Sequence, residues 1–123
     1  MNVLVLAASP VDADLLRREL GSEVEGAQVL VVSPAVNESP LAFWVSDSDE
    51  AIADAQQRLD ETLERLRGGG LSARGATGDS EGLVAIQDAL ATFPADRVVI
   101  VDDREVADEA AERLDVPVVA IAP

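Results

Sequence analysis

The sequence predicts a three-layer α/β/α domain built around a parallel sheet of five strands. Short apolar segments alternate with longer segments of helical spacing from one end of the 123-residue chain to the other. The most apolar of these segments carry almost no charge, as expected of parallel strands that helices cover on both faces. Because such strands are joined by right-handed crossovers, the alternation indicates a single domain, residues 1–123, with helices on both faces of the sheet.

Five segments are expected to form the strands. Residues 3–8, 28–32 and 97–101 are rich in Val, Leu, Ile and Ala and predict buried strands. Residues 71–77 contain Arg74 and Gly75, which places that strand at an edge. Residues 116–122 form the fifth strand and carry no charge.

Three of the intervening helices are predicted mainly from their first residues. Ser9 is expected to cap the first helix, with Pro10 at its first helical position. Asp79 or Ser80 is expected to cap the third, and Asp102-Asp103 precede the fourth.

The longest helix is expected from Asp47 or Ser48 to the three glycines at 68–70. Apolar residues at spacings of three and four place one of its faces on the sheet. Two acid-first pairs, Asp54–Arg58 and Glu61–Arg65, are expected as ion pairs on its exposed face.

Composition excludes several classes of function. The chain has no histidine, lysine, cysteine or tyrosine, so it lacks the side chains for thiol, imidazole or Schiff-base catalysis. Its net charge of −15 opposes binding to nucleic acid and to anionic membranes. The absence of cysteine fits a cytoplasmic protein.

Several motifs resemble the universal stress protein family along essentially the whole chain. The most specific is Trp44-Val45-Ser46-Asp47-Ser48-Asp49-Glu50-Ala51 before the long helix; Gly78-Asp79, Ala85-Ile86 and Phe93-Pro94-Ala95-Asp96 follow in order. The resemblance implies the strand order 3-2-1-4-5. It also implies where a nucleotide would bind: an Asp near the end of strand one, and a G-x2-G-x9-G-[S/T] segment after strand four.

Both parts of that nucleotide motif are missing. Strand one ends in Ala7-Ala8-Ser9, and the chain after strand four, residues 102–108, is acidic and contains no glycine. Glycine is what allows a loop to approach a phosphate closely. We therefore predict a non-catalytic regulatory or binding protein that uses no cofactor and does not bind ATP in the family's usual way.

The candidate ligand crevice lies at the carboxyl ends of the strands, where open α/β sheets bind ligands. Its residues are Ala8, Ser9, Val36, Gly78, Asp79, Asp102, Asp103 and Arg104. Asp102 and Asp103 are interpreted first as capping residues and second as Mg²⁺ ligands of a phosphohydrolase. Gly78 is interpreted first as a turn glycine and second as part of a divergent pocket that senses a small molecule or a nucleotide.

Two further features suggest contacts with other molecules. Phe43 and Trp44 form a candidate aromatic lid, which either packs on the domain's own core or forms a wall for a ligand or partner. The last strand is uncharged and is expected at an edge, so its residues Val116, Val118, Val119, Ala120 and Ile121 are predicted to pair in a homodimer.

Overall fold

The computed structural model describes residues 1–34, 48–78 and 81–121. Strands and helices alternate along the chain. The strands are β1 (Asn2–Ala7), β2 (Gln28–Pro34), β3 (Ser72–Gly78), β4 (Arg97–Val101) and β5 (Val118–Ile121). The helices between them are α1 (Ala13–Leu20), α3 (Ser48–Gly68), α4 (Gly82–Thr92) and α5 (Arg104–Arg113), and a 3-10 helix, η1 (Gly21–Gly26), follows α1. Val36, Phe43, Trp44 and Asp79 lie outside the described residues, so their predicted roles are not addressed by the structure.

The strands form one parallel sheet in the order β3-β2-β1-β4-β5. The predicted fold class and strand order are therefore confirmed. β1 occupies the centre: its Leu4 is aligned with Leu30 of β2 on one side and with Val98 of β4 on the other. β3 and β5 are the two edges, as their sequences predict.

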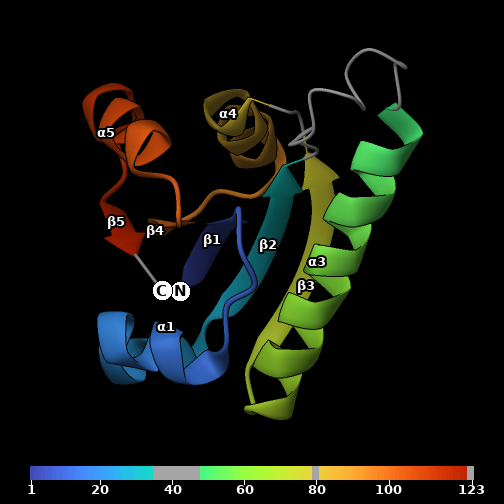
Figure 1. The fold of residues 1–123 in the computed structure, drawn as a ribbon. Coiled ribbons are helices and arrows are strands. Elements are labelled where there is room, and N and C mark those ends of the chain that lie inside the picture. The colour runs from blue at the N-terminus through green and yellow to red at the C-terminus, as the bar shows by residue number, and fades with distance from the viewer. Residues whose placement is uncertain (35–47, 79–80, 122–123) are drawn as a thin grey trace.

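Two apolar layers hold the helices to the sheet. Helices α1 and α3 lie on one face and α4 and α5 on the other (Figure 1). Alternate residues of β1 supply the two layers: Val3 and Val5 face the α1/α3 layer, whereas Leu4 and Leu6 face the α4/α5 layer. All four are completely buried, which explains why this strand reads as an unbroken apolar run.

The first helix begins later than the sequence predicts. Its N-cap is Asp12, whose carboxylate accepts a hydrogen bond from the Leu15 N–H at 2.9 Å. Ser9 and Pro10 precede the helix and do not cap it. The prediction was wrong because Ser9-Pro10 and Asp12 are both good helix starts, and Ser9 has a different partner, described below.

The other predicted boundaries are closer to the structure. α3 ends at Gly68, as predicted, but α4 has Glu81 as its N-cap residue rather than Asp79 or Ser80. β5 begins at Val118; Val116 lies before it and packs against the α4/α5 layer. Val116 is therefore not part of the edge strand, contrary to the prediction.

The long helix also corrects a prediction about its charges. Among the described residues, neither Asp54–Arg58 nor Glu61–Arg65 forms an ion pair. Arg58 is half-buried and binds the end of β2 instead. Main-chain acceptors at the sheet edge thus compete successfully with an exposed i, i+4 pair, which contributes only a few tenths of a kcal/mol.

A charged contact ties η1 to α1 and to the end of α3. The Arg17 guanidinium donates to both carboxylate oxygens of Glu25 and to the Gly69 carbonyl. The hydrogen bond from Arg17 lowers the pKa of Glu25 and raises that of Arg17.

None of the described helices is long and apolar enough to cross a membrane.

The junction of α3 with α1 leads to a stability prediction. A Cβ at Gly69 would lie 2.3 Å from the Cβ of Ala13, whereas a Cβ at Gly68 would meet nothing within 4 Å. Because the Ala13 Cβ cannot rotate away, Gly69→Ala must move the helix ends and should lower the free energy of unfolding by about 1–3 kcal/mol. Gly68→Ala is the matched control and should be neutral or stabilising by up to about 1 kcal/mol. Urea denaturation of both variants measures the difference, and equal effects would contradict this packing.

Candidate functional site

The candidate site lies where the direction of the chain connections reverses. β1 leads through α1 to β2 on one side, while β4, which the chain reaches only after β3 and α4, lies on the other side of β1. The connections that follow β1 and β4 therefore diverge at the carboxyl ends of these two strands. Open α/β sheets bind ligands at such a point. Ala8 and Ser9 follow β1 here, and Asp102 and Asp103 follow β4.

A direct hydrogen bond spans this crevice. The Ser9 hydroxyl donates to Oδ2 of Asp102 at 2.6 Å, and the Ala8 N–H donates to the Val101 carbonyl at 3.3 Å. The two chain segments that would have to flank a ligand thus bind each other. This contact brings together Ser9 and Asp102, two of the residues predicted to line the site.

The backbone at Asp102 is unusual. Its φ is 58°, the only positive value at a non-glycine residue among those the structure describes. Its N–H donates to the Ile121 carbonyl at 2.8 Å, which ties the turn to β5. Aspartate is one of the few residues that tolerate the left-handed region, and such conformations cluster at functional sites. Asp102 is therefore a turn residue and not the helix cap that the sequence predicts.

The first turns of the helices beside the crevice are capped by the protein's own carboxylates. Asp103 caps α5 by accepting from the Val106 N–H at 3.1 Å, which confirms its predicted capping role. Asp12 caps α1 in the same way. Free N–H groups at helix N-termini commonly bind phosphate. At the N-termini of α1 and α5, a carboxylate of the protein already accepts a hydrogen bond from one of these N–H groups.

Arg104 forms an exposed ion pair along its own helix. It pairs along the helix with Asp108 at 3.4 Å, and 85% of its side chain is exposed. A hollow of about 190 Å³ does lie at the ends of β4 and β5. Its lining comprises Ile100, Asp102, Asp103, Arg104, Ala120 and Ile121. With two carboxylates and one arginine that is already paired, its chemistry favours hydrogen-bond donors and cations over phosphates.

Gly78 is not brought together with these residues. It is the last residue of β3, aligned with Pro34, and β3 lies three strand spacings from β4, about 14 Å. Its φ is not positive, so its backbone does not require the conformational freedom of glycine. A Cβ here would lie 2.7 Å from Val32 Cγ1 and 2.9 Å from the Ala85 Cβ. Glycine is needed because α4 packs closely against the sheet.

The sequence did not reveal Arg58 as a residue of this edge of the sheet. Its Nη1 donates to Ser33 Oγ at 3.3 Å and to the Pro34 carbonyl at 3.2 Å, and the side chain is half-buried. Ser33 is completely buried at the end of β2. A polar residue at the end of an apolar strand was the available signal, since a buried hydroxyl needs a partner.

Chemistry at a magnesium centre has little support in this arrangement. Asp103 is engaged in capping and Asp102 accepts from Ser9. Residues 1–34, 48–78 and 81–121 contain no group of three or more Asp, Glu, His or Cys side chains that could hold a metal ion. The two carboxylates at the crevice are thus already engaged in hydrogen bonds within the protein.

The left-handed backbone at Asp102 leads to a prediction with two substitutions at one position. Asp102→Gly removes the bond to Ser9 but keeps the backbone unstrained, whereas Asp102→Ala removes the same bond and places a Cβ in the left-handed region. Asp102→Ala should therefore be the less stable by about 1 kcal/mol. Ser9→Ala removes the bond without altering residue 102 and is the control. Equal urea midpoints for the Gly and Ala variants would contradict the left-handed conformation.

Comparison with known proteins is consistent with this geometry. No protein-family model and no curated protein matches the sequence. Solved structures do match the fold. A universal stress protein family protein from Arabidopsis thaliana, solved with AMP bound, has a TM-score of 0.70 at 14% identity, covering 99% of this chain and 91% of its own. Universal stress protein from Archaeoglobus fulgidus has a TM-score of 0.70 at 20% identity, with 98% and 93% covered.

A universal stress protein family protein from Burkholderia pseudomallei has a TM-score of 0.63 at 17% identity, with 98% of this chain and 94% of its own covered. At these identities the similarity establishes the fold, and it does so along nearly the whole chain. The strand order observed here matches the order implied by the sequence resemblance. The chain therefore has the α/β fold of the universal stress proteins.

Proposed function

We propose that this domain is a non-catalytic binding or regulatory protein of the universal stress protein type that does not bind ATP in the family's usual way. The Ser9–Asp102 hydrogen bond across the crevice carries the proposal. A nucleotide lying between the ends of β1 and β4 would have to break this contact and separate the two segments. The neighbour from Arabidopsis thaliana was solved with AMP, so a protein of this fold can accept a nucleotide.

Electrostatics supports the same conclusion. The carboxylates of Asp12 and Asp103 accept from the first turns of their helices, where a phosphate would otherwise find donors. Asp102 adds a third carboxylate, and the chain as a whole carries a net charge of −15. A triphosphate would thus meet repulsion without the backbone donors or glycine loop that could compensate for it.

A second candidate is a sensor of a small molecule other than a nucleotide. The strained backbone at Asp102 favours it, because left-handed non-glycine residues cluster at sites of function. The hollow at the ends of β4 and β5 would suit a small cation or a ligand with hydrogen-bond donors. Both candidates fit a protein located in the cytoplasm, as the absence of cysteine suggests.

Calorimetric titration with Mg-ATP and with AMP at moderate salt tests the first candidate. We expect no saturable heat with either nucleotide, because the crevice offers carboxylates where phosphates need donors. A dissociation constant in the low micromolar range, equivalent to about 8 kcal/mol of binding free energy, would refute the proposal. Circular dichroism of the same sample confirms that the protein is folded.

The domain is further proposed to form a homodimer through β5. This strand is an edge, and its described residues, Val118–Ile121, are uncharged. The Pro117 carbonyl accepts a hydrogen bond from the Val98 N–H of β4, and the Ile121 carbonyl accepts one from the Asp102 N–H just after β4. Because main-chain groups alternate in direction along a strand, those of Val118 and Ala120 point away from β4 and are available to a second copy.

A substitution at Ala120 tests the dimer. Ala120 is exposed, so Ala120→Pro removes one outward N–H with little effect on the core, and it should shift the protein from dimer to monomer in sedimentation velocity. Ala120→Ser keeps the N–H and should remain dimeric. A wild-type protein that sediments as a monomer at tens of micromolar would rule out the interface.

A further inference from the structure

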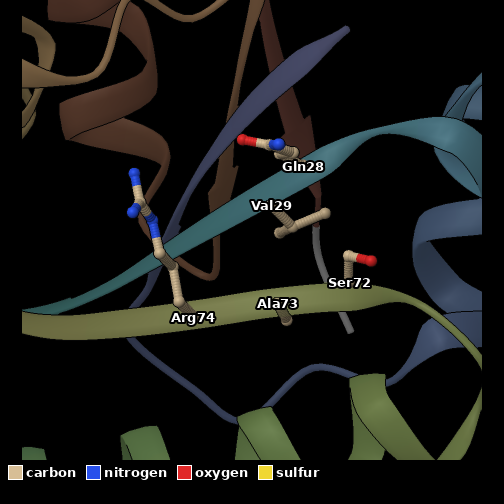
Figure 2. A pocket seen from close by; sticks show the side chains of 5 residues that line it. All are labelled: Gln28, Val29, Ser72, Ala73 and Arg74. Atoms are coloured by element: carbon tan, nitrogen blue, oxygen red, sulfur yellow. The ribbon is translucent and has the colours of Figure 1, made fainter.

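A second site lies at the opposite end of the sheet, far from the crevice. A hollow of about 290 Å³ is formed at the amino ends of β2 and β3. Its lining comprises Gln28, Val29, Ser72, Ala73 and Arg74. Figure 2 shows the side chains of Gln28, Ser72 and Arg74 on one side of the two strands, with Val29 and Ala73 directed to the other. Three polar side chains therefore surround one hollow.

The hollow exists because α4 does not cover all of the sheet. At its carboxyl end β3 touches α4, since a Cβ at Gly78 would meet Ala85. Toward its amino end the same face of β3 is open, and Ser72, Arg74 and Ala76 are exposed. The side chains on this face of β3 therefore lie beside α4 and are not covered by it.

Arg74 is held in place without losing its charge. Its guanidinium carbon lies 5.5 Å from the centre of the Phe93 ring, a cation–π distance, and Phe93 is buried at the end of α4. No ion pair to Arg74 is found among residues 1–34, 48–78 and 81–121. The ring thus orients the guanidinium and leaves its N–H groups available to a ligand.

The other two polar groups are similarly available. Neither the Gln28 amide nor the Ser72 hydroxyl has a hydrogen-bond partner within the described part of the chain. An oxygen ligand in the hollow could therefore accept from the guanidinium, while the amide and hydroxyl, which both donate and accept, could bind a neighbouring polar group. This combination is typical of a site for an anion that also carries a hydroxyl or carbonyl oxygen.

The geometry points to a binding site for a small, singly charged carboxylate that carries a hydroxyl or oxo group beside its carboxylate. A guanidinium pairs with a carboxylate through two parallel hydrogen bonds. A single arginine on a protein of net charge −15 favours one negative charge over the two of a phosphate. This site is separate from the crevice and goes beyond the function proposed for it.

An extended peptide added to β3 fits the hollow less well than a small molecule. The Nε of Arg67 donates to the Ala73 carbonyl at 2.9 Å, so the main-chain acceptor at this position of the edge is already occupied. A peptide strand that paired with β3 here could not use the Ala73 carbonyl as a hydrogen-bond acceptor unless it displaced Arg67. A ligand lying on the open face needs no main-chain group of β3.

Titration with lactate, followed by ¹H–¹⁵N NMR, tests the site. We expect saturable shifts of the Gln28 side-chain amide and the Arg74 Nε–H, with propionate, which lacks the hydroxyl, binding several-fold more weakly. Arg74→Gln should abolish saturation, and Arg74→Lys should weaken it by about tenfold or more, because lysine lacks the planar fork. Arg18→Gln removes an equal charge from the exposed surface of α1 and should leave binding unchanged.

Several outcomes would overturn the inference. These are no saturable shift with lactate, equal binding by wild type and Arg74→Gln, and phosphate binding as tight as that of lactate. Shifts centred on Ser9 and Asp102 would place the anion in the crevice. That result would refute the proposed binding site at the amino ends of β2 and β3. Ser72→Ala provides a second variant at the exposed edge and should weaken lactate more than propionate, because only lactate presents the extra hydroxyl.

Discussion

The complete burial of β1 is the constraint on which the rest of the structure depends. Val3, Leu4, Val5, Leu6 and Ala7 are all inaccessible to solvent. A strand with apolar side chains on both faces is stable only between two layers of helices, and its main-chain groups need a strand on each side. Central position, parallel neighbours and helices on both faces follow together from this one segment.

The same constraint locates the crevice and determines its polarity. With β1 in the centre, the connections after β1 and β4 diverge, and the segments that follow these strands face each other. The N-termini of α1 and α5 carry partial positive charge near these segments. In this chain that charge is already complemented by Asp12 and Asp103, while Ser9 and Asp102 bind each other across the gap. The protein's own carboxylates occupy positions where a ligand phosphate would otherwise be stabilised.

The sequence predicts the fold better than it predicts the site, for a physical reason. Apolar runs such as residues 3–7 require burial whatever their neighbours, so the strand positions could be inferred from them, while the strand order came from the family resemblance. A polar side chain finds its partner only after folding. Ser9 could cap a helix locally, yet it binds Asp102, 93 positions away. Arg58 had an acid four positions earlier, yet it binds the end of β2. Gly78 looked like a turn residue, and only the approach of Ala85 explains it.

The use of arginine in this acidic chain accounts for the difference between the two ends of the sheet. Arg17, Arg58 and Arg67 each donate to a main-chain carbonyl, of Gly69, Pro34 and Ala73 respectively. A planar guanidinium can bind a carbonyl and a second group at once, which a lysine ammonium does less well. Most of the scarce positive charge is thus committed to structure or to ion pairs, including that of Arg58 and Arg104 at the carboxyl end of the sheet. Arg74 differs because an aromatic ring holds it, and a ring orients a cation without neutralising it. The amino end of β3 is consequently a place in this strongly acidic molecule where an anion meets an oriented guanidinium that has no ion-pair partner in the described part of the chain.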